Sequence, residues 1–174
     1  DGKAKAIGST GQVHPRSSMG IANVGYATTL TWANDLIPNL EKQAITPMFG
    51  ENPVELGLSG MDDELLARLR AEPKYQELFP LAFPDGSEPV SLDHIVKALA
   101  CFQRTVISGS SRYDKYENNI DRSALTASEV RGRDLFFSER LECFHCHGSY
   151  NFSDSVAAEG SSIREAFFHN NALY

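Results

Sequence analysis

Two cysteines and a histidine near the end of the chain form its most informative motif. Residues 143–147 read Cys-Phe-His-Cys-His, which is the C-x-x-C-H spacing that attaches a c-type haem. The thiols of Cys143 and Cys146 can each bond one vinyl group of the porphyrin, and His147 is placed to ligate the iron. The motif therefore predicts one haem c on this chain and redox chemistry at its iron.

Two other chemistries can use the same residues and stay open. A redox disulfide between Cys143 and Cys146 is typical of a thioredoxin-like βαβ context, which the surrounding sequence lacks. A closed zinc site needs four ligands. His147 could supply one, with His145 or His169, but the chain has no second C-x-x-C or H-x-x-x-H pair. The spacing favours haem.

The composition is that of a medium-sized acidic protein. Its 174 residues suffice for one medium domain or two small ones. The net charge of −7 argues against a nucleic-acid partner, and no apolar run is long enough to span a membrane. Because covalent haem attachment takes place outside the bacterial cytoplasm, the motif predicts a periplasmic location. Cys101, the third cysteine, is expected to be a small buried core residue.

The elements that must position the motif are predicted to be helices. Residues 1–60 are rich in Gly, Pro, Asn, Ser and Thr, so this stretch should be mostly loop, with a helix near 40–44. Leucines with a helical period predict a helix over 61–71, which Pro73 ends. Ser91 is a suitable N-cap for a helix that runs to about Val106.

The helix after Ser91 carries an apolar stripe, and the region beyond it leads to the haem motif. Ile95, Leu99, Phe102 and Val106 recur at helical spacing and are expected to be core. Residues 108–123 are polar and turn-prone, which makes them the best candidate boundary. The run from Thr126 to Glu129 is a capping box, and it opens a helix that delivers the chain to Cys143. No strand pattern is visible. The predicted fold class is mainly α, with helical cytochrome c-like haem domains, long loops and little or no β.

Several segments, taken in order, resemble the family of MauG and the bacterial di-haem cytochrome c peroxidases. The segments 125–132, 135–137 and 143–147 resemble the entrance to that family's second haem domain. Asn23, Trp32 and the segments 40–44 and 52–57 resemble its first domain, and 102–105 resembles a further family segment. The resemblance covers essentially the whole chain. Within that family, the chain is most similar to the methanobactin-associated MauG-type members, over the segments 30–34, 47–51 and 137–147.

The resemblance implies how the chain is organised. Residues 1–122 would be the remainder of the first, peroxidatic cytochrome c-like domain, and 123–174 the start of a second haem c domain. Family members carry two C-x-x-C-H motifs, whereas this chain has one. We therefore expect a fragment of a longer protein with two haems; the alternative is a single-haem protein. Ser17 stands where the family has an asparagine that helps to hold calcium. A hydroxyl is a weaker ligand for this ion than a carbonyl oxygen, so calcium binding is left open.

The resemblance also implies site residues. Glu55 resembles the family's distal acid–base, which would move a proton between the two oxygens of peroxide. Gln43 resembles its polar companion, and Trp32, the only tryptophan, resembles a residue that couples the two haems electronically. From the residues alone, a surface acid in a loop is the favoured interpretation of Glu55, and Trp32 can be read as a core or anchor residue.

The implied function is an oxidoreductase that uses hydrogen peroxide to oxidise a protein partner. In the methanobactin-associated members the reaction converts tryptophan to kynurenine on a periplasmic copper-binding protein. Two alternatives remain. One is a conventional cytochrome c peroxidase that takes electrons from a small electron-transfer protein, and the other is a haem c electron carrier without enzymatic activity.

Overall fold

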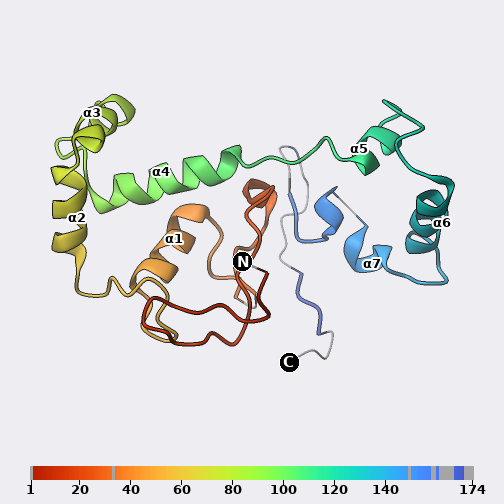
Figure 1. Cartoon of the computed structure of the whole chain (residues 1–174), viewed down its shortest axis with the longest axis horizontal. Helices are drawn as coiled ribbons and strands as arrows, with labels where there is room; N and C mark the ends of the chain where they lie inside the picture. The colour runs from red at the N-terminus through yellow and green to blue at the C-terminus, as the bar shows by residue number, and fades with distance from the viewer. Residues whose placement is uncertain (1, 33, 149, 158–159, 161–166, 171–174) are drawn as a thin grey trace. The chain divides into compact units, whose positions relative to one another are not determined.

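The structure, a computed structural model, describes residues 2–32, 34–148, 150–157, 160 and 167–170. The described residues form α-helices joined by long loops (Figure 1). The helices are α1 (Leu40–Phe49), α2 (Asp62–Ala71), α3 (Pro73–Ala82), α4 (Leu92–Thr105), α5 (Arg112–Glu117), α6 (Ala127–Phe136) and α7 (Phe144–His147), with short 3-10 turns at Val24–Tyr26 and Tyr150–Phe152. Extended pairing within the described ranges is limited to isolated bridges, such as Ile7 with Val13. The predicted mainly α fold class is confirmed.

The chain forms two compact units, which are described separately. The first unit comprises Asp1–Ile21 and Leu30–Thr105, and the second comprises Ala22–Thr29 and Val106–Tyr174. The predicted division into domains at residue 122 stays a prediction. In the described part of the chain, no helix is both long and apolar enough to cross a membrane.

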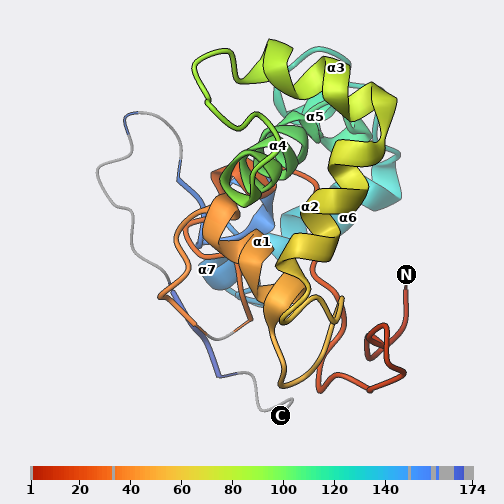
Figure 2. The ribbon, with the colours of Figure 1, turned by 90° about the vertical axis from the view of Figure 1, so that its left-hand side faces the viewer.

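The core of the first unit lies where α1 packs against α4 (Figures 1 and 2). Its buried members are Ala44, Met48, Phe79, Val90, Ile95 and Val96. The N-cap of α1 is Asn39, whose side chain accepts a hydrogen bond from the Lys42 backbone N–H at 2.9 Å. Burial of apolar side chains between these helices supplies the main stabilisation of the unit.

The region around Pro73 differs from the prediction. The helix predicted over 61–71 is present as α2, and its Glu64 and Arg68 form an ion pair at 2.7 Å. Pro73 ends that helix but also begins α3, which the sequence reading missed. Proline suits the first turn of a helix because the N–H that it lacks would have no partner there. The side chain of Glu72 caps α3 by accepting from Lys74.

Helix α4 begins as predicted but buries a different face. The Ser91 hydroxyl accepts from the His94 N–H at 3.3 Å, which confirms the N-cap. The buried residues are Ile95, Val96 and Ala100. Leu99 and Phe102, predicted as core, are 43% and 62% exposed, and Cys101, predicted to be buried, is exposed. The face of α4 that packs against α1 is therefore displaced by one residue position from the predicted apolar stripe. It includes the small Ala100, which is fully buried.

In the second unit, α5 and α6 are linked by charge pairs. The capping box predicted at Thr126 and Glu129 is present at the start of α6. Helix α5 was missed by the sequence reading. The two terminal guanidinium nitrogens of its Arg112 donate to the Glu129 carboxylate at 2.7 Å. Arg133 on α6 donates to Glu117 on α5 at 2.7 Å. These contacts hold together the two helices that precede the haem motif.

A buried asparagine ties the early segment 22–29 into the second unit. Asn23 is 4% exposed and has a left-handed backbone, with φ 59°. Its Nδ2 donates to the Ser108 carbonyl at 2.8 Å and to Asn151 Oδ1 at 3.1 Å, and its Oδ1 accepts from the Ser108 N–H at 2.7 Å. One amide side chain thus connects the segments at 22–29, 106–108 and 151.

Candidate functional site

The two motif cysteines lie one helical turn apart. Cys143 occupies the N-cap position of α7 and Cys146 follows within the helix. Residues three apart in a helix share a face, so both thiols can approach one edge of a planar ring system. Both are free and half-buried. The alternative of a disulfide is therefore not adopted in this structure.

The ring of His147 is oriented by a backbone carbonyl. Its Nδ1 lies 2.8 Å from the carbonyl oxygen of Phe152, and the side chain is exposed. The carbonyl can only accept, so Nδ1 carries the proton and the lone pair of Nε2 is left free. A metal-ligating histidine needs this tautomer and this kind of partner. The turn that presents the carbonyl contains Asn151 and Phe152 at positive φ, 64° and 53°.

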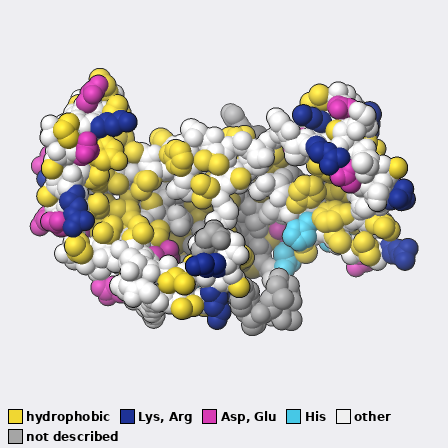
Figure 3. Space-filling model, viewed as in Figure 1, with side chains coloured by type: hydrophobic (Ala, Val, Ile, Leu, Met, Phe, Trp, Pro, Cys, Tyr) yellow, Lys and Arg dark blue, Asp and Glu magenta, His cyan; other side chains and the backbone are white. Residues whose placement is uncertain are grey.

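Aromatic rings surround the histidine on one side. The Phe136 ring centre lies 6.4 Å from that of His147 and 5.8 Å from that of Phe152. Tyr113 packs on Phe152 at 4.9 Å, and burial raises the pKa of Tyr113 above its ordinary value. Figure 3 shows apolar side chains gathered beside histidines over the region of α6 and α7.

These residues fit a covalently bound haem. Two free thiols one turn apart, a histidine with a free Nε2 and an apolar surround are the donor set that haem c requires. Leu141 and Phe152 are 52% and 42% exposed, which offers apolar surface for a porphyrin to cover. Zinc fits less well, because within the described ranges no group of three convergent Cys, His, Asp or Glu ligands includes either cysteine.

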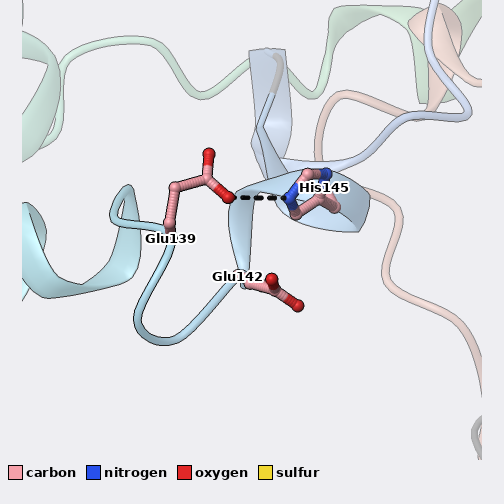
Figure 4. A group of neighbouring side chains, drawn as sticks. All are labelled: Glu139, Glu142 and His145. Carbon is pink, nitrogen blue, oxygen red and sulfur yellow. Dashed lines mark ion pairs between the residues drawn. The ribbon is translucent and has the colours of Figure 1, made fainter.

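The histidine inside the motif points to a different set of groups. His145 Nε2 lies 3.8 Å from a carboxylate oxygen of Glu139, and Glu142 is close to both (Figure 4). All three side chains are exposed. His169, the other candidate zinc ligand, pairs with Asp154 at 2.5 Å. Among the described residues, His145 and His169 each lie beside carboxylates and not in a common ligand group with Cys143 or Cys146. We therefore assign these two histidines no role in the motif.

In the first unit, Gln43 and Glu55 lie on either side of the C-terminal end of α1 in the chain. Gln43 is half-buried in α1, and Glu55 is in the loop that follows it. This loop folds back on the helix, since the Leu56 N–H donates to the Pro47 carbonyl at 2.9 Å and the Leu58 N–H to the Met48 carbonyl at 3.0 Å. The Glu55 side chain is 43% exposed. Its predicted catalytic role, like that of Gln43, stays a prediction.

A second loop, residues 6–16, holds Glu55 from the other side. The Ser9 N–H donates to the Glu55 carbonyl at 2.7 Å, and Gln12 Oε1 accepts from the Val54 N–H at 2.8 Å. A Cβ at Gly8 would lie 1.8 Å from the Val54 carbonyl oxygen, so only glycine permits this approach. The backbone of residues 54 and 55 is thereby fixed between two loops.

His14 is a residue that the sequence analysis did not single out. It is buried, with 7% of its surface exposed. Its Nε2 lies 3.2 Å from the Val54 carbonyl oxygen, and its Nδ1 lies 4.0 Å from Glu55 Oε1. No local pattern marks this pairing, because the two residues are 41 positions apart.

The third predicted site residue, Trp32, is held at the surface of the first unit. It is 46% exposed. Its indole N–H donates to the Ser17 carbonyl at 3.0 Å, and the Arg16 guanidinium lies 5.9 Å from the ring centre. The predicted electronic role of Trp32 stays a prediction, and calcium binding near Ser17 stays open.

Comparison with known proteins identifies the family. The model of the family described as di-haem cytochrome c peroxidase matches residues 1–122. This chain belongs to the di-haem cytochrome c peroxidase family. The predicted family relationship, which extends to MauG, is confirmed.

Individual relatives match 88% or more of the chain at moderate identity. Methylamine utilization protein MauG of Methylorubrum extorquens is 32% identical over 154 residues, which is 88% of this chain and 41% of the relative. A cytochrome-c peroxidase of Pseudomonas sp. (strain SCT) is 34% identical over all of this chain and 44% of its own length. A crystal structure of a MauG-like protein associated with microbial copper homeostasis is 43% identical, with a TM-score of 0.94, over all of this chain and 49% of that one. The chain thus spans less than half the length of these relatives.

Proposed function

We propose that this chain is part of a periplasmic di-haem enzyme that uses hydrogen peroxide to oxidise a protein partner. The observation that carries the proposal is the His147 ring, whose Nδ1–H is held by the Phe152 carbonyl so that Nε2 is free beside two cysteine thiols. Membership of the di-haem peroxidase family supports it. Residues 1–122 would belong to the peroxidatic domain and 123–174 to the second haem domain.

The residues of the motif would hold the cofactor. Bound haem c would supply an iron that exchanges electrons with peroxide and with the partner. Cys143 and Cys146 would anchor it by thioether bonds, and His147 would ligate the iron through Nε2. The hydrogen bond from Nδ1 to Phe152 makes the imidazole a stronger electron donor, which tunes the potential. The family pattern implies a second haem elsewhere in the full protein.

Glu55 would handle the proton of peroxide. Its carboxylate takes the proton from one peroxide oxygen and delivers it to the other, which leaves as water. Gln43, with an amide that can both donate and accept, would orient the peroxide. The two loops that clamp residues 54 and 55 fix the backbone from which the carboxylate extends, which limits the positions that the carboxylate can reach.

Trp32 would carry oxidising equivalents. An indole is readily oxidised, so it can serve as a relay site in electron transfer. The hydrogen bond to Ser17 fixes the ring position, and Arg16 beside the ring disfavours a positive charge on it. Both contacts affect how easily the indole gives up an electron.

The proposed partner is a periplasmic copper-binding protein with an oxidisable tryptophan. One solved relative, 43% identical, is described as associated with microbial copper homeostasis, which supports this choice. In the reaction, two molecules of peroxide each deliver one oxygen atom to the indole and leave as two waters, giving N-formylkynurenine. Hydrolysis then releases formic acid and leaves kynurenine, so oxygen and electrons balance.

A conventional cytochrome c peroxidase is the second candidate. It is favoured by the peroxidase of Pseudomonas sp., which is 34% identical over the whole chain. Such an enzyme takes two electrons from a small electron-transfer protein and reduces peroxide to water. A haem c electron carrier would use neither Gln43 nor Glu55.

The test is Glu55→Gln in the full-length holoprotein, with Glu51→Gln, an exposed acid of the same loop, as the matched control. We expect Glu55→Gln to lower peroxide-driven oxidation by roughly 10²-fold or more while the haem spectra stay intact. Glu51→Gln should keep its rate. Mass spectrometry of candidate partners after peroxide treatment separates partner oxidation from peroxide reduction with a small cytochrome. Equal turnover in Glu55→Gln and the wild type would remove the catalytic assignment.

A further inference from the structure

We propose that His14 is a positioning residue for Glu55 and exchanges a proton with its carboxyl group. The inference rests on the proposed function of Glu55, and it adds a buried base that neither the motif nor the family resemblance assigned. The carboxyl would thereby be able to change its protonation state between turnovers without waiting for solvent.

The imidazole of His14 is fixed by its surroundings. The side chain is 9% exposed, and the residue's backbone N–H donates to the Ala6 carbonyl at 2.9 Å. Nε2 lies 3.2 Å from the Val54 carbonyl oxygen, which can only accept, so Nε2 carries a proton. In the neutral ring Nδ1 is then the acceptor, and it faces the carboxyl group of Glu55 at 4.0 Å.

The two ring nitrogens of His14 therefore face two adjacent residues. Nε2 contacts the backbone carbonyl of Val54, and Nδ1 faces the side chain of Glu55. The close packing of Gly8 on Val54 and the hydrogen bond from Ser9 to the Glu55 carbonyl keep this segment against the loop that carries His14. A tight backbone clamp around a partly mobile carboxyl group preserves the pairing while the carboxyl group moves.

The distance allows exchange after a small movement. A direct hydrogen bond requires about 2.7–3.2 Å between nitrogen and oxygen, so the carboxyl group must approach by about 1 Å or use one bridging water. The Glu55 side chain is 43% exposed and has room for a rotamer change. In one position it meets His14, and in another it reaches out of the loop toward peroxide.

The proton transfer balances within the pair. A protonated Glu55 gives its proton to Nδ1, which leaves a carboxylate and an imidazolium that donates from both nitrogens, to Val54 and to Glu55. The reverse step restores the acid. The charged side chain that the structure places against the ring is Glu55, whereas Arg16, two residues on, directs its guanidinium over Trp32.

The test uses the full-length holoprotein with His14→Gln. A glutamine amide can still donate to the Val54 carbonyl in place of Nε2, but it cannot accept a proton. His94→Gln is the matched control, because His94 also contacts a backbone carbonyl, that of Pro89 at 2.7 Å, and the structure places it on α4 and not in the loop of His14. We expect His14→Gln to lower the peroxide-driven rate about tenfold, less than loss of the acid–base itself, and to change its pH profile.

A second readout does not depend on activity. The imidazole 15N chemical shifts of His14 should change in Glu55→Gln, because the variant replaces the carboxylate that Nδ1 faces at 4.0 Å. Unchanged imidazole shifts overturn the pairing. If Glu55→Gln is impaired but His14→Gln keeps the wild-type rate and pH profile, the role of His14 is wrong and that of Glu55 stands. A His14→Gln variant that loses only thermal stability also overturns the proposal. Full activity of Glu55→Gln instead refutes the proposed function.

Discussion

The imidazole Nδ1 of His147 lies 2.8 Å from the carbonyl oxygen of Phe152, and this contact selects the ring tautomer whose Nε2 can bind a metal. The carbonyl points at the ring because Asn151 and Phe152 both have left-handed backbones. The residue five positions after the motif histidine is thus part of the candidate haem site, although it contributes only its backbone.

Asn151 tests how much this turn matters. Asn151→Gly and Asn151→Val both lose the hydrogen bond from Asn23, but only valine strongly disfavours the observed φ of 64°. We expect Asn151→Val to raise the midpoint potential of the attached haem relative to Asn151→Gly, because the ligand loses its hydrogen-bonded partner and becomes a weaker donor. Spectroelectrochemistry of both holoproteins measures the difference. Equal potentials would show that the turn does not orient His147.

The two motif cysteines should anchor one haem. The double variant Cys143→Ala/Cys146→Ala leaves no thiol on α7 for the vinyl groups, so covalent haem per molecule should fall by one. Cys101→Ala is the matched control, since Cys101 is an exposed thiol on α4. A pyridine haemochrome assay against protein concentration gives the count. Unchanged haem in the double variant would contradict covalent attachment at this motif.

Glu129 should make the second unit sensitive to acid. Hydrogen bonds from Arg112, and then from Thr126, lower the pKa of the Glu129 carboxyl group from 4.5 to about 2. A carboxyl group with a depressed folded-state pKa stabilises the fold above its unfolded pKa, and this contribution disappears as the pH falls from about 4.5 toward 2. Glu129→Gln should lower the thermal midpoint at pH 7 and flatten its decline across that window.

The control for this titration is Glu77→Gln, which changes an exposed acid on α3. Its thermal midpoint should follow that of the wild type at every pH. A Glu129→Gln variant that loses no stability at neutral pH would indicate that the contacts from Arg112 and Thr126 contribute nothing to the fold.

Trp32 can be tested by a pair of substitutions. Trp32→Phe keeps an aromatic ring but removes both the oxidisable indole and the N–H that donates to Ser17. Its stability cost should be about 1 kcal/mol, the usual value of one hydrogen bond. Partner oxidation should slow while the haem count stays the same, and Trp32→Tyr, which restores an oxidisable ring, should recover part of the rate. Equal rates in Trp32→Phe and the wild type would exclude a relay through this residue.

Features that depend on near neighbours in the chain were predicted from the sequence. The C-x-x-C-H spacing places both cysteines on one turn of α7, and the capping residues Ser91 and Thr126 begin α4 and α6 as expected. Each of these signals spans five residues or fewer, and helix hydrogen bonds are equally local. The mainly α fold follows from the same periodicities.

Which surfaces become buried was decided only by the tertiary structure. The apolar stripe of α4 predicted Leu99 and Phe102 as core, yet the helix packs through Ile95, Val96 and Ala100. The pairing of His14 with Glu55 and the clamp of Asn23 on Ser108 join residues far apart in the chain. Local patterns determine which segments can form helices and which side chains can do chemistry. Contacts between distant segments depend on the path of the whole chain, and that path brings a buried imidazole to the candidate acid.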